Sequence, residues 1–213
     1  MGGEIKGKAT DGFVSRYFNR RISSRLTWLI VKHDVPLTPN QVSLVSFMLA
    51  LSSFPFFMAG LYPLAGVIVQ LSSIIDGVDG ELARARGISS PVGGFIDSIL
   101  DRFADAVIIT GLILSSYAEL GFSVIAWGLA ALLGSLMVSY IHSQGRALLG
   151  LHVAKIGKVP MYASRDVRLF IVFLGSILYS PLLTLILLVV LTISYCTLKT
   201  IDVYLKYRKE SRD

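Results

Sequence analysis

The stretch DGVDGELARARGISSPVGGFIDSILD, residues 76–101, decides how this 213-residue chain folds and what chemistry it can support. It contains five acidic residues and two arginines, and long apolar runs flank it on both sides. Carboxylates next to hydrocarbon cost free energy and are seldom kept unless they have a role. The acids of this stretch are therefore the first candidates for a functional site.

The composition is typical of a membrane protein. Hydrophobic residues make up 54% of the chain, and its mean hydropathy is +0.67, which is more apolar than soluble domains of this size. A helix of about 20 apolar residues crosses the hydrocarbon core of a bilayer. We expect an all-α integral membrane protein with six transmembrane helices, preceded by a cytoplasmic amphipathic surface helix over residues 12–33. The expected spans are residues 40–61, 63–85, 91–117, 122–149, 166–179 and 181–204.

The chain divides by composition into a short leading segment and a membrane domain. Residues 1–11 are Gly-rich and polar, which is typical of a linker or of a trimmed end. This composition is compatible with another domain upstream in the native protein. Residues 12–213 form the expected membrane domain.

The basic residues predict how the protein is oriented. The net charge is +6, and the Lys and Arg residues fall into four groups separated by turns that carry none. Basic residues concentrate on the cytoplasmic side of a membrane. We therefore expect a multi-pass protein of the cell membrane with both termini and the acidic stretch facing the cytoplasm. Because the charge lies in separate membrane-edge clusters, no nucleic-acid partner is expected.

Helical spacing divides the acids into two sets. Asp76 and Asp79 are three residues apart near the end of one expected helix, and Asp97 and Asp101 are four apart in the next. The short link between these helices makes them antiparallel neighbours, so the two acidic faces can meet. Asp105 continues the second face, but we interpret it as a capping or snorkelling residue at the membrane edge.

Four carboxylates in one pocket repel one another unless protons or cations intervene. Their oxygen atoms select hard ions, Mg²⁺ first and Mn²⁺ or Ca²⁺ next, and no His or Cys lies nearby to favour zinc. A pair of divalent ions held by such carboxylates is suited to binding a diphosphate. Arg84 can donate two hydrogen bonds to a phosphate, and the neighbouring glycines leave room for a substrate.

At this point the sequence resembles the CDP-alcohol phosphotransferase family. The family signature is D-x-x-D-G-x-x-A-R, eight further residues, and then G-x-x-x-D-x-x-x-D. Every identity and spacing is kept here, on Asp76, Asp79, Gly80, Ala83, Arg84, Gly93, Asp97 and Asp101. The resemblance implies a membrane enzyme, usually a homodimer, that transfers a substituted phosphate from a CDP-alcohol to an acceptor hydroxyl and releases CMP.

The resemblance also implies roles for individual residues. Two divalent ions, Mg²⁺ with Mn²⁺ as the alternative, are expected on Asp76, Asp79, Asp97 and Asp101. Asp101 is also the expected general base that takes the proton of the acceptor. The CDP moiety is expected to contact Asn40, Gly80, Ala83, Arg84 and Ser90. Asn40 and Ser90 are also explained as helix-cap and loop residues.

A second basic cluster is a candidate for binding the acceptor. It lies on the same expected side of the membrane as the acids and comprises Lys155, Lys158, Arg165 and Arg168. Such residues can hold a phosphate group, although ordinary positive-inside charge near lipid head groups explains them equally well. A small, polar, phosphorylated acceptor is the partner that this cluster fits.

Local segments of the sequence are similar to the inositol-phosphate branch of the family. These segments are TPNQVSL, SSIIDGVDGELAR and SRDVRLF. The similarity implies an inositol phosphate acceptor, a CDP-inositol or CDP-lipid donor, and a cytidylyltransferase domain that is fused or acts as a partner. A phospholipid synthase of the same family with glycerol phosphate or serine as acceptor is an alternative.

A cation or proton transporter would also place acids within membrane helices. The acids here lie near one expected membrane face, and no series of polar residues leads across to the other. An intramembrane aspartyl protease would need a Gly-x-Gly-Asp loop, which the sequence lacks.

Overall fold

The computed structural model describes residues 12–210, so the linker expected over residues 1–11 lies outside the described residues. The described part is helical and contains no strand, as the sequence predicts. Two of its segments are short, a π-helical turn η1 and a 3₁₀ turn η2. The elements in chain order are η1 (Ser15–Asn19), α1 (Arg20–Lys32), α2 (Pro39–Met58), α3 (Tyr62–Ala85), α4 (Pro91–Leu120), α5 (Phe122–Leu149), η2 (Val153–Lys155), α6 (Arg165–Ile177) and α7 (Pro181–Glu210).

Two helices that border the acidic stretch begin at well-defined caps. Thr38 opens α2 with a capping box, in which its hydroxyl accepts from Gln41 N at 3.3 Å and its own N–H donates to Gln41 Oε1 at 2.8 Å. Ser90 opens α4, where its hydroxyl accepts from Gly93 N at 3.0 Å. Pro follows each cap at the first helical position, where its missing N–H costs nothing. Thr38 and Ser90 are thus the N-caps of these two helices.

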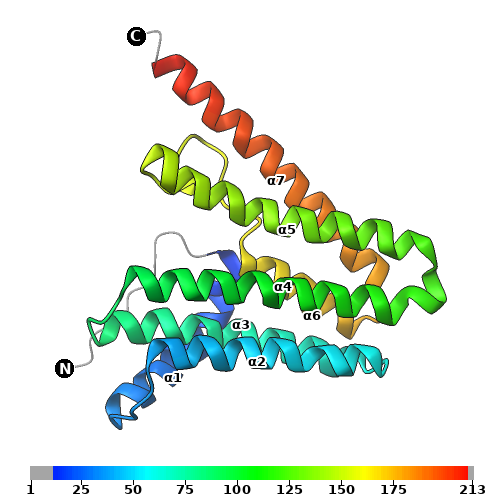
Figure 1. Cartoon of the computed structure of the whole chain (residues 1–213), viewed down its shortest axis with the longest axis horizontal. Helices are drawn as coiled ribbons and strands as arrows, with labels where there is room; N and C mark the ends of the chain where they lie inside the picture. The colour runs from blue at the N-terminus through cyan, green and yellow to red at the C-terminus, as the bar shows by residue number, and fades with distance from the viewer. Residues whose placement is uncertain (1–11, 211–213) are drawn as a thin grey trace.

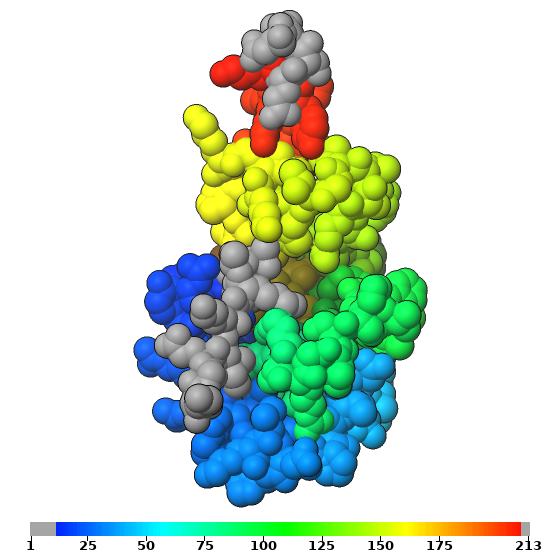
Figure 2. Space-filling view, turned by 90° about the vertical axis from the view of Figure 1, so that its left-hand side faces the viewer, coloured from blue at the N-terminus to red at the C-terminus, as the bar shows by residue number. Residues whose placement is uncertain are grey.

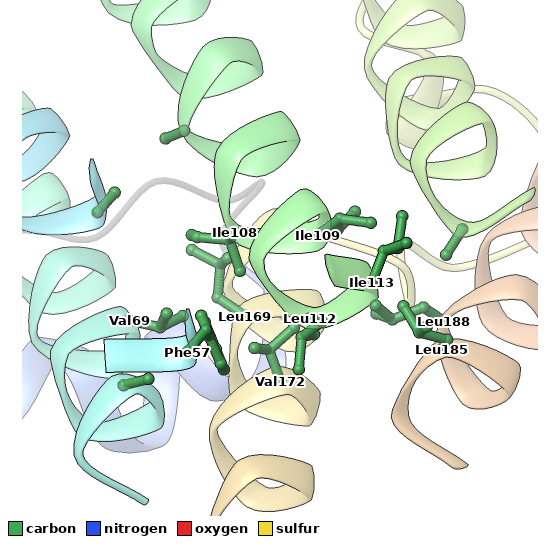
Figure 3. Close-up of a cluster of buried hydrophobic side chains, with 14 of the residues drawn as sticks. Phe57, Val69, Ile108, Ile109, Leu112, Ile113, Leu169, Val172, Leu185 and Leu188 are labelled. Carbon is green, nitrogen blue, oxygen red and sulfur yellow. The ribbon is translucent and has the colours of Figure 1, made fainter. Parts of the chain in front are cut away.

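Helix α4 lies at the centre of the bundle. In Figure 1 it runs between α2 and α3 on one side and α5 and α7 on the other. Figure 3 shows its apolar side chains, among them Ile108 and Leu112, packed against Phe57 of α2, Leu169 of α6 and Leu185 of α7. These five side chains are at most 3% exposed, and within a membrane the close packing of such side chains holds helices together. The central position of α4 holds the acids that it carries in a fixed place.

Four of the helices are long and apolar enough to cross a membrane, namely α2, α4, α5 and α7. Helix α3 is not among them because Gln70, two serines and the acidic residues of its last turns lower its hydropathy. Helix α6 has 13 residues, which span about 20 Å, less than the roughly 30 Å of a hydrocarbon core. The structure therefore supports a multi-pass membrane protein, and the count of six spans stays a prediction.

The segment expected to be a surface helix packs on the bundle through its polar face. Asn19, Ser23 and Thr27 are buried at steps of four residues. The buried carboxylate of Glu81 on α3 accepts from Ser23 Oγ and from Thr27 Oγ1, both at 2.9 Å. Apolar side chains of the same segment remain exposed, including Phe13 at 71%. This arrangement suits a helix whose outer face meets lipid, but its place on a membrane surface stays a prediction.

Candidate active site

The turn between α3 and α4 brings the acids of the two helices together. Carboxylate oxygens of Asp76, Asp97 and Asp101 lie within 4.8 Å of one another. Asp79 lies beside this group and lines both neighbouring cavities together with Asp97. Ser43 on α2 donates to Asp79 Oδ2 at 2.5 Å, which fixes the orientation of that carboxylate. All four acids of the signature thus belong to one cluster.

Arg165, the first residue of α6, reaches into this cluster. Its Nη1 atom lies 2.6 Å from Asp101 Oδ1 and 3.1 Å from Asp76 Oδ1. Its side chain is 13% exposed, so the ion pairs are shielded from water and are stronger than surface pairs. A positive charge at this point offsets the mutual repulsion of the carboxylates.

The donor set of the cluster fits a hard divalent ion. It consists of carboxylate oxygens from two facing helices, the ligand type that Mg²⁺ and Mn²⁺ prefer. Two of these carboxylates, Asp76 and Asp101, already pair with Nη1 of Arg165, and an oxygen of Asp97 lies within 4.8 Å of theirs. Carboxylates that surround one positively charged group can also bind a metal cation.

A cavity of about 510 Å³ opens on one side of the cluster. It lies between the starts of α2 and α4 and the end of α3. The residues that the sequence predicted to contact CDP all line it, namely Asn40, Gly80, Ala83, Arg84 and Ser90. Gly93 also lines this cavity, and a Cβ atom there would lie 3.1 Å from both Asn40 Oδ1 and Ser90 Oγ. The absence of a side chain at Gly93 therefore widens the cavity where those two polar groups face it.

A second cavity of about 260 Å³ opens on the other side of the cluster. The first cavity shares four of its lining residues, namely Asp79, Gly80, Arg84 and Asp97. Further residues of α3 and α4 line it, and η1, the start of α1 and the start of α6 complete its walls and add the cations Arg20 and Arg165. Figure 2 views the end of the molecule where the N-terminal helical segment (blue) and the α3–α4 turn (green) lie. Two cavities therefore meet at one carboxylate cluster.

Of the four basic residues predicted to bind an acceptor, Arg165 lines this second cavity. Arg168 is buried one turn further along α6, where its Nη1 donates to the carbonyl oxygen of Ser135 at 2.7 Å. Lys155 and Lys158 are exposed and line neither cavity. The segment that carries Lys158 is instead held to α7, because Lys158 N donates to Asp202 Oδ2 at 2.8 Å.

The structure corrects the interpretation of Asp105. This residue was expected to cap a helix or snorkel at the membrane edge, but it is 3% exposed and pairs with two arginines of α6. Arg165 Nε lies 3.0 Å from Asp105 Oδ1, and Arg168 Nη2 lies 3.4 Å from Asp105 Oδ2. Asp105 follows Asp101 by four residues, so both lie on the same face of the helix. This spacing is the sequence feature that indicates a buried position for Asp105.

Sequence reasoning also missed Arg20 and Glu81. Both line the second cavity, but no sequence motif marks either residue as part of a site. Arg20 was grouped with the basic residues of the surface helix, and Glu81 falls on a variable position of the signature.

Comparison with known proteins gives consistent matches. The family profile described as CDP-alcohol phosphatidyltransferase matches residues 36–199. A protein of Rubrobacter xylanophilus named "Bifunctional IPC transferase and DIPP synthase" is 47% identical over 171 residues, which cover 80% of this chain and 38% of that protein. An "Archaetidylinositol phosphate synthase" of Pyrococcus horikoshii is 35% identical over 144 residues, 66% of this chain and 70% of the relative. The chain spans about two fifths of the length of the first curated relatives that it matches.

The fold also matches a solved structure. Phosphatidylinositol phosphate synthase of Mycobacterium tuberculosis, solved with CDP-DAG bound, superposes with a TM-score of 0.71 at 24% identity. The match covers 86% of this chain and 94% of the other. Another structure of the same synthase, in complex with manganese and citrate, gives a TM-score of 0.70. At this identity the likeness is one of fold.

Proposed function

The chain belongs to the CDP-alcohol phosphatidyltransferase family, and from this premise we propose that it transfers a substituted phosphate from a CDP-alcohol to a hydroxyl group of an inositol phosphate, with release of CMP. One observation carries the proposal: two cavities meet at a single cluster of carboxylates. A reaction that joins a donor to an acceptor needs a separate place for each and a shared point where they react.

The larger cavity is the proposed donor site. Its lining combines the amide of Asn40, the hydroxyl of Ser90 and the guanidinium of Arg84. The guanidinium group can pair with the anionic diphosphate, and the neutral amide and hydroxyl can form hydrogen bonds with a nucleotide. This set therefore suits a nucleotide diphosphate. Gly80 and Ala83 place no bulky side chain on the α3 wall of this cavity, so a bound donor can approach the helix backbone closely.

The smaller cavity is the proposed acceptor site. Arg165 lines it close to Asp101, and Arg20 lines it from the N-terminal segment. These two guanidinium groups, together with that of Arg84 on the wall shared by both cavities, suit a phosphorylated alcohol better than an uncharged one. Lys155 and Lys158 do not belong to the proposed acceptor site, because both are exposed and line neither cavity.

Asp101 is the proposed general base, since it belongs to the cluster shared by both cavities and also lines the acceptor side. Asp76, Asp79, Asp97 and Asp101 are the residues that would hold divalent ions. Such ions, Mg²⁺ or Mn²⁺, would neutralise the diphosphate and stabilise the departing CMP. Asp101 would then accept the proton of the acceptor hydroxyl as it attacks in line.

The charge pattern supports a proposed membrane arrangement. We propose six spans, an N-terminal helix on the membrane surface, and both termini and the site on the cytoplasmic side. A homodimer, and a cytidylyltransferase domain fused or acting as a partner, belong to the same proposal. The Rubrobacter relative is named as bifunctional and this chain covers 38% of it, which supports a second domain in addition to this one.

A lipid donor is a second candidate. This chain covers 70% of the archaetidylinositol phosphate synthase of Pyrococcus horikoshii, a larger share than it covers of the bifunctional relatives. In that case the CDP-alcohol is a CDP-lipid, and the acceptor stays an inositol phosphate.

The test is product identification with the purified full chain in lipid nanodiscs. CDP-inositol, CDP-diacylglycerol and CDP-archaeol are each combined with inositol phosphate, glycerol phosphate or serine in the presence of Mg²⁺. We expect CMP release and a product of matching mass with inositol phosphate and one of the donors, and loss of both when EDTA is added.

Two outcomes would contradict the proposal. CMP release with glycerol phosphate or serine alone would assign a different acceptor within the family. No CMP release with any pair, together with cation or proton flux in proteoliposomes, would favour a transporter instead.

A further inference from the structure

Asp105 is a buried carboxylate that lies behind the site rather than in it. It is 3% exposed on α4 and lines neither of the two cavities that meet at the acid cluster. It follows Asp101 by four residues, which puts the two side chains on one face of α4, about one turn apart. A buried carboxylate is costly unless it is paired and hydrogen-bonded, so its partners explain why it is there.

Its partners are two arginines on consecutive turns of α6. Arg165 Nε donates to Asp105 Oδ1 at 3.0 Å, and Arg168 Nη2 lies 3.4 Å from Asp105 Oδ2. One carboxylate on α4 therefore holds both guanidinium groups, and each of its oxygens serves one of them.

The contact with Arg165 has a directional consequence. A guanidinium group is planar and presents its N–H groups in a rigid fork. When Nε is fixed on Asp105, the plane and the reach of the Nη atoms are fixed as well. Nη1 then points to the acid cluster, 2.6 Å from Asp101 and 3.1 Å from Asp76. Asp105 thus determines where the charge of Arg165 lies in the smaller cavity.

Arg168 has a different role. Its Nη1 donates to the carbonyl oxygen of Ser135 on α5 at 2.7 Å, and its side chain is 4% exposed. Arg168 lines neither of the two cavities beside the carboxylate cluster. Its contacts join α4, α5 and α6, so its loss is expected to lower stability without changing the cavity directly.

We propose that Asp105 is a positioning residue, which holds Arg165 in the orientation needed to bind the phosphate of the acceptor. This inference rests on the proposed function for its kinetic readout. It adds a role for a residue outside the signature, which acts through Arg165 and touches neither substrate nor metal.

The test is a double-mutant cycle in the full chain, with Asp105→Asn, Arg165→Gln and the double variant. Asparagine keeps the shape of the side chain and removes its charge. We expect Asp105→Asn to raise the KM for inositol phosphate about tenfold or more and the donor KM less than about twofold. The double variant should match Arg165→Gln alone, because Asp105 acts through that arginine.

Arg168→Gln is the matched control, since it removes the other arginine held by Asp105. We expect it to lower the thermal midpoint while the acceptor KM changes much less than in Asp105→Asn. If Asp105→Asn does not fold, Asp105→Glu keeps the charge and moves it by one methylene. That variant should still raise the acceptor KM selectively.

Equal effects of Asp105→Asn on both KM values, or independent effects of the two substitutions, would overturn the inference. A second readout separates it from the proposed function. Binding of inorganic phosphate is measured calorimetrically with Mg²⁺ and CMP present, and it should weaken about tenfold in both Asp105→Asn and Arg165→Gln. If the unaltered chain shows no turnover, the proposed function fails, and this measurement decides on Asp105. Unchanged or absent phosphate binding would then overturn its positioning role.

Discussion

Arg165 Nη1 lies 2.6 Å from Oδ1 of Asp101, although 64 positions separate the two residues along the chain. The guanidinium group thus stands in the cluster that is the proposed binding site for divalent ions. Two cations cannot share the same carboxylate oxygens without repulsion. The contact therefore links metal binding to the position of Arg165.

Arg165→Gln should strengthen the binding of divalent ions in the absence of substrate. The substitution removes a positive charge that is paired with Asp76 and Asp101, so a metal ion no longer competes with it. We expect Mn²⁺ to bind about three- to tenfold more tightly, as measured by electron paramagnetic resonance of the free ion.

Lys155→Gln is the control for this measurement. It also removes one positive charge, but Lys155 is exposed and lines neither cavity. Its effect on Mn²⁺ affinity should be small. Weaker Mn²⁺ binding in Arg165→Gln would mean that the arginine supports the ligand geometry instead of competing with the ion.

Asp101→Asn should abolish CMP release and leave donor binding largely intact. Asparagine cannot accept the proton of the acceptor hydroxyl, and loss of a general base costs about 10²–10⁴-fold in rate. The donor cavity does not include Asp101. Turnover is followed by CMP release and donor affinity by calorimetry with CDP. Normal turnover of this variant would exclude Asp101 as the base.

The sequence was sufficient to predict the helices around the site and the meeting of the four signature acids. Pro after a capping residue marks the starts of α2 and α4. The short link between α3 and α4 keeps the end of one helix near the start of the other, and α2 packs closely against both. The spacing of Asp76, Asp79, Asp97 and Asp101 then places them on facing surfaces. These features are local, so pattern and turn length determine them.

The partners of these acids could not be predicted in the same way. Arg165 and Asp105 are 60 positions apart, and their contact depends on how α6 packs beside α3 and α4. The N-terminal helix was equally difficult. Burial of apolar residues is the usual rule, but this helix buries Ser23 and Thr27 and exposes Phe13. A lipid environment removes the cost of exposing apolar side chains, which leaves polar contacts to fix the packing.

Glu81→Ala should loosen the N-terminal helix from the bundle. The variant removes the acceptor of the hydrogen bonds from Ser23 and Thr27, both buried. Loss of a charged, buried partner is expected to cost about 1–3 kcal/mol. Hydrogen exchange over residues 20–32 should speed up, and the thermal midpoint should fall.

Glu119→Ala is the matched control because Glu119 is an exposed acid near the end of α4. It should change neither exchange nor melting. Unchanged exchange over residues 20–32 in Glu81→Ala would show that other contacts, such as Ser15 N with Asp166 Oδ2 at 2.5 Å, are sufficient to hold the helix.

Gly93→Ala and Gly94→Ala form a pair that tests the shape of the donor cavity. Both glycines line it in the first turn of α4. A Cβ at Gly93 would lie 3.1 Å from both Asn40 Oδ1 and Ser90 Oγ, whereas a Cβ at Gly94 would meet nothing within 4 Å. The first substitution crowds two proposed CDP contacts, and the second adds a methyl group in open space.

We expect Gly93→Ala to raise the donor KM about three- to thirtyfold with little change in the acceptor KM. Gly94→Ala should leave both close to the values of the unaltered chain. Alanine favours the helix over glycine by about 1 kcal/mol at either position, so helix stability cannot explain a difference between the two variants. Steady-state kinetics with the donor and the acceptor varied in turn provides the measurement. Equal donor KM values for the two variants would mean that CDP does not approach α4 at Gly93, and the donor site would then have to lie closer to α3.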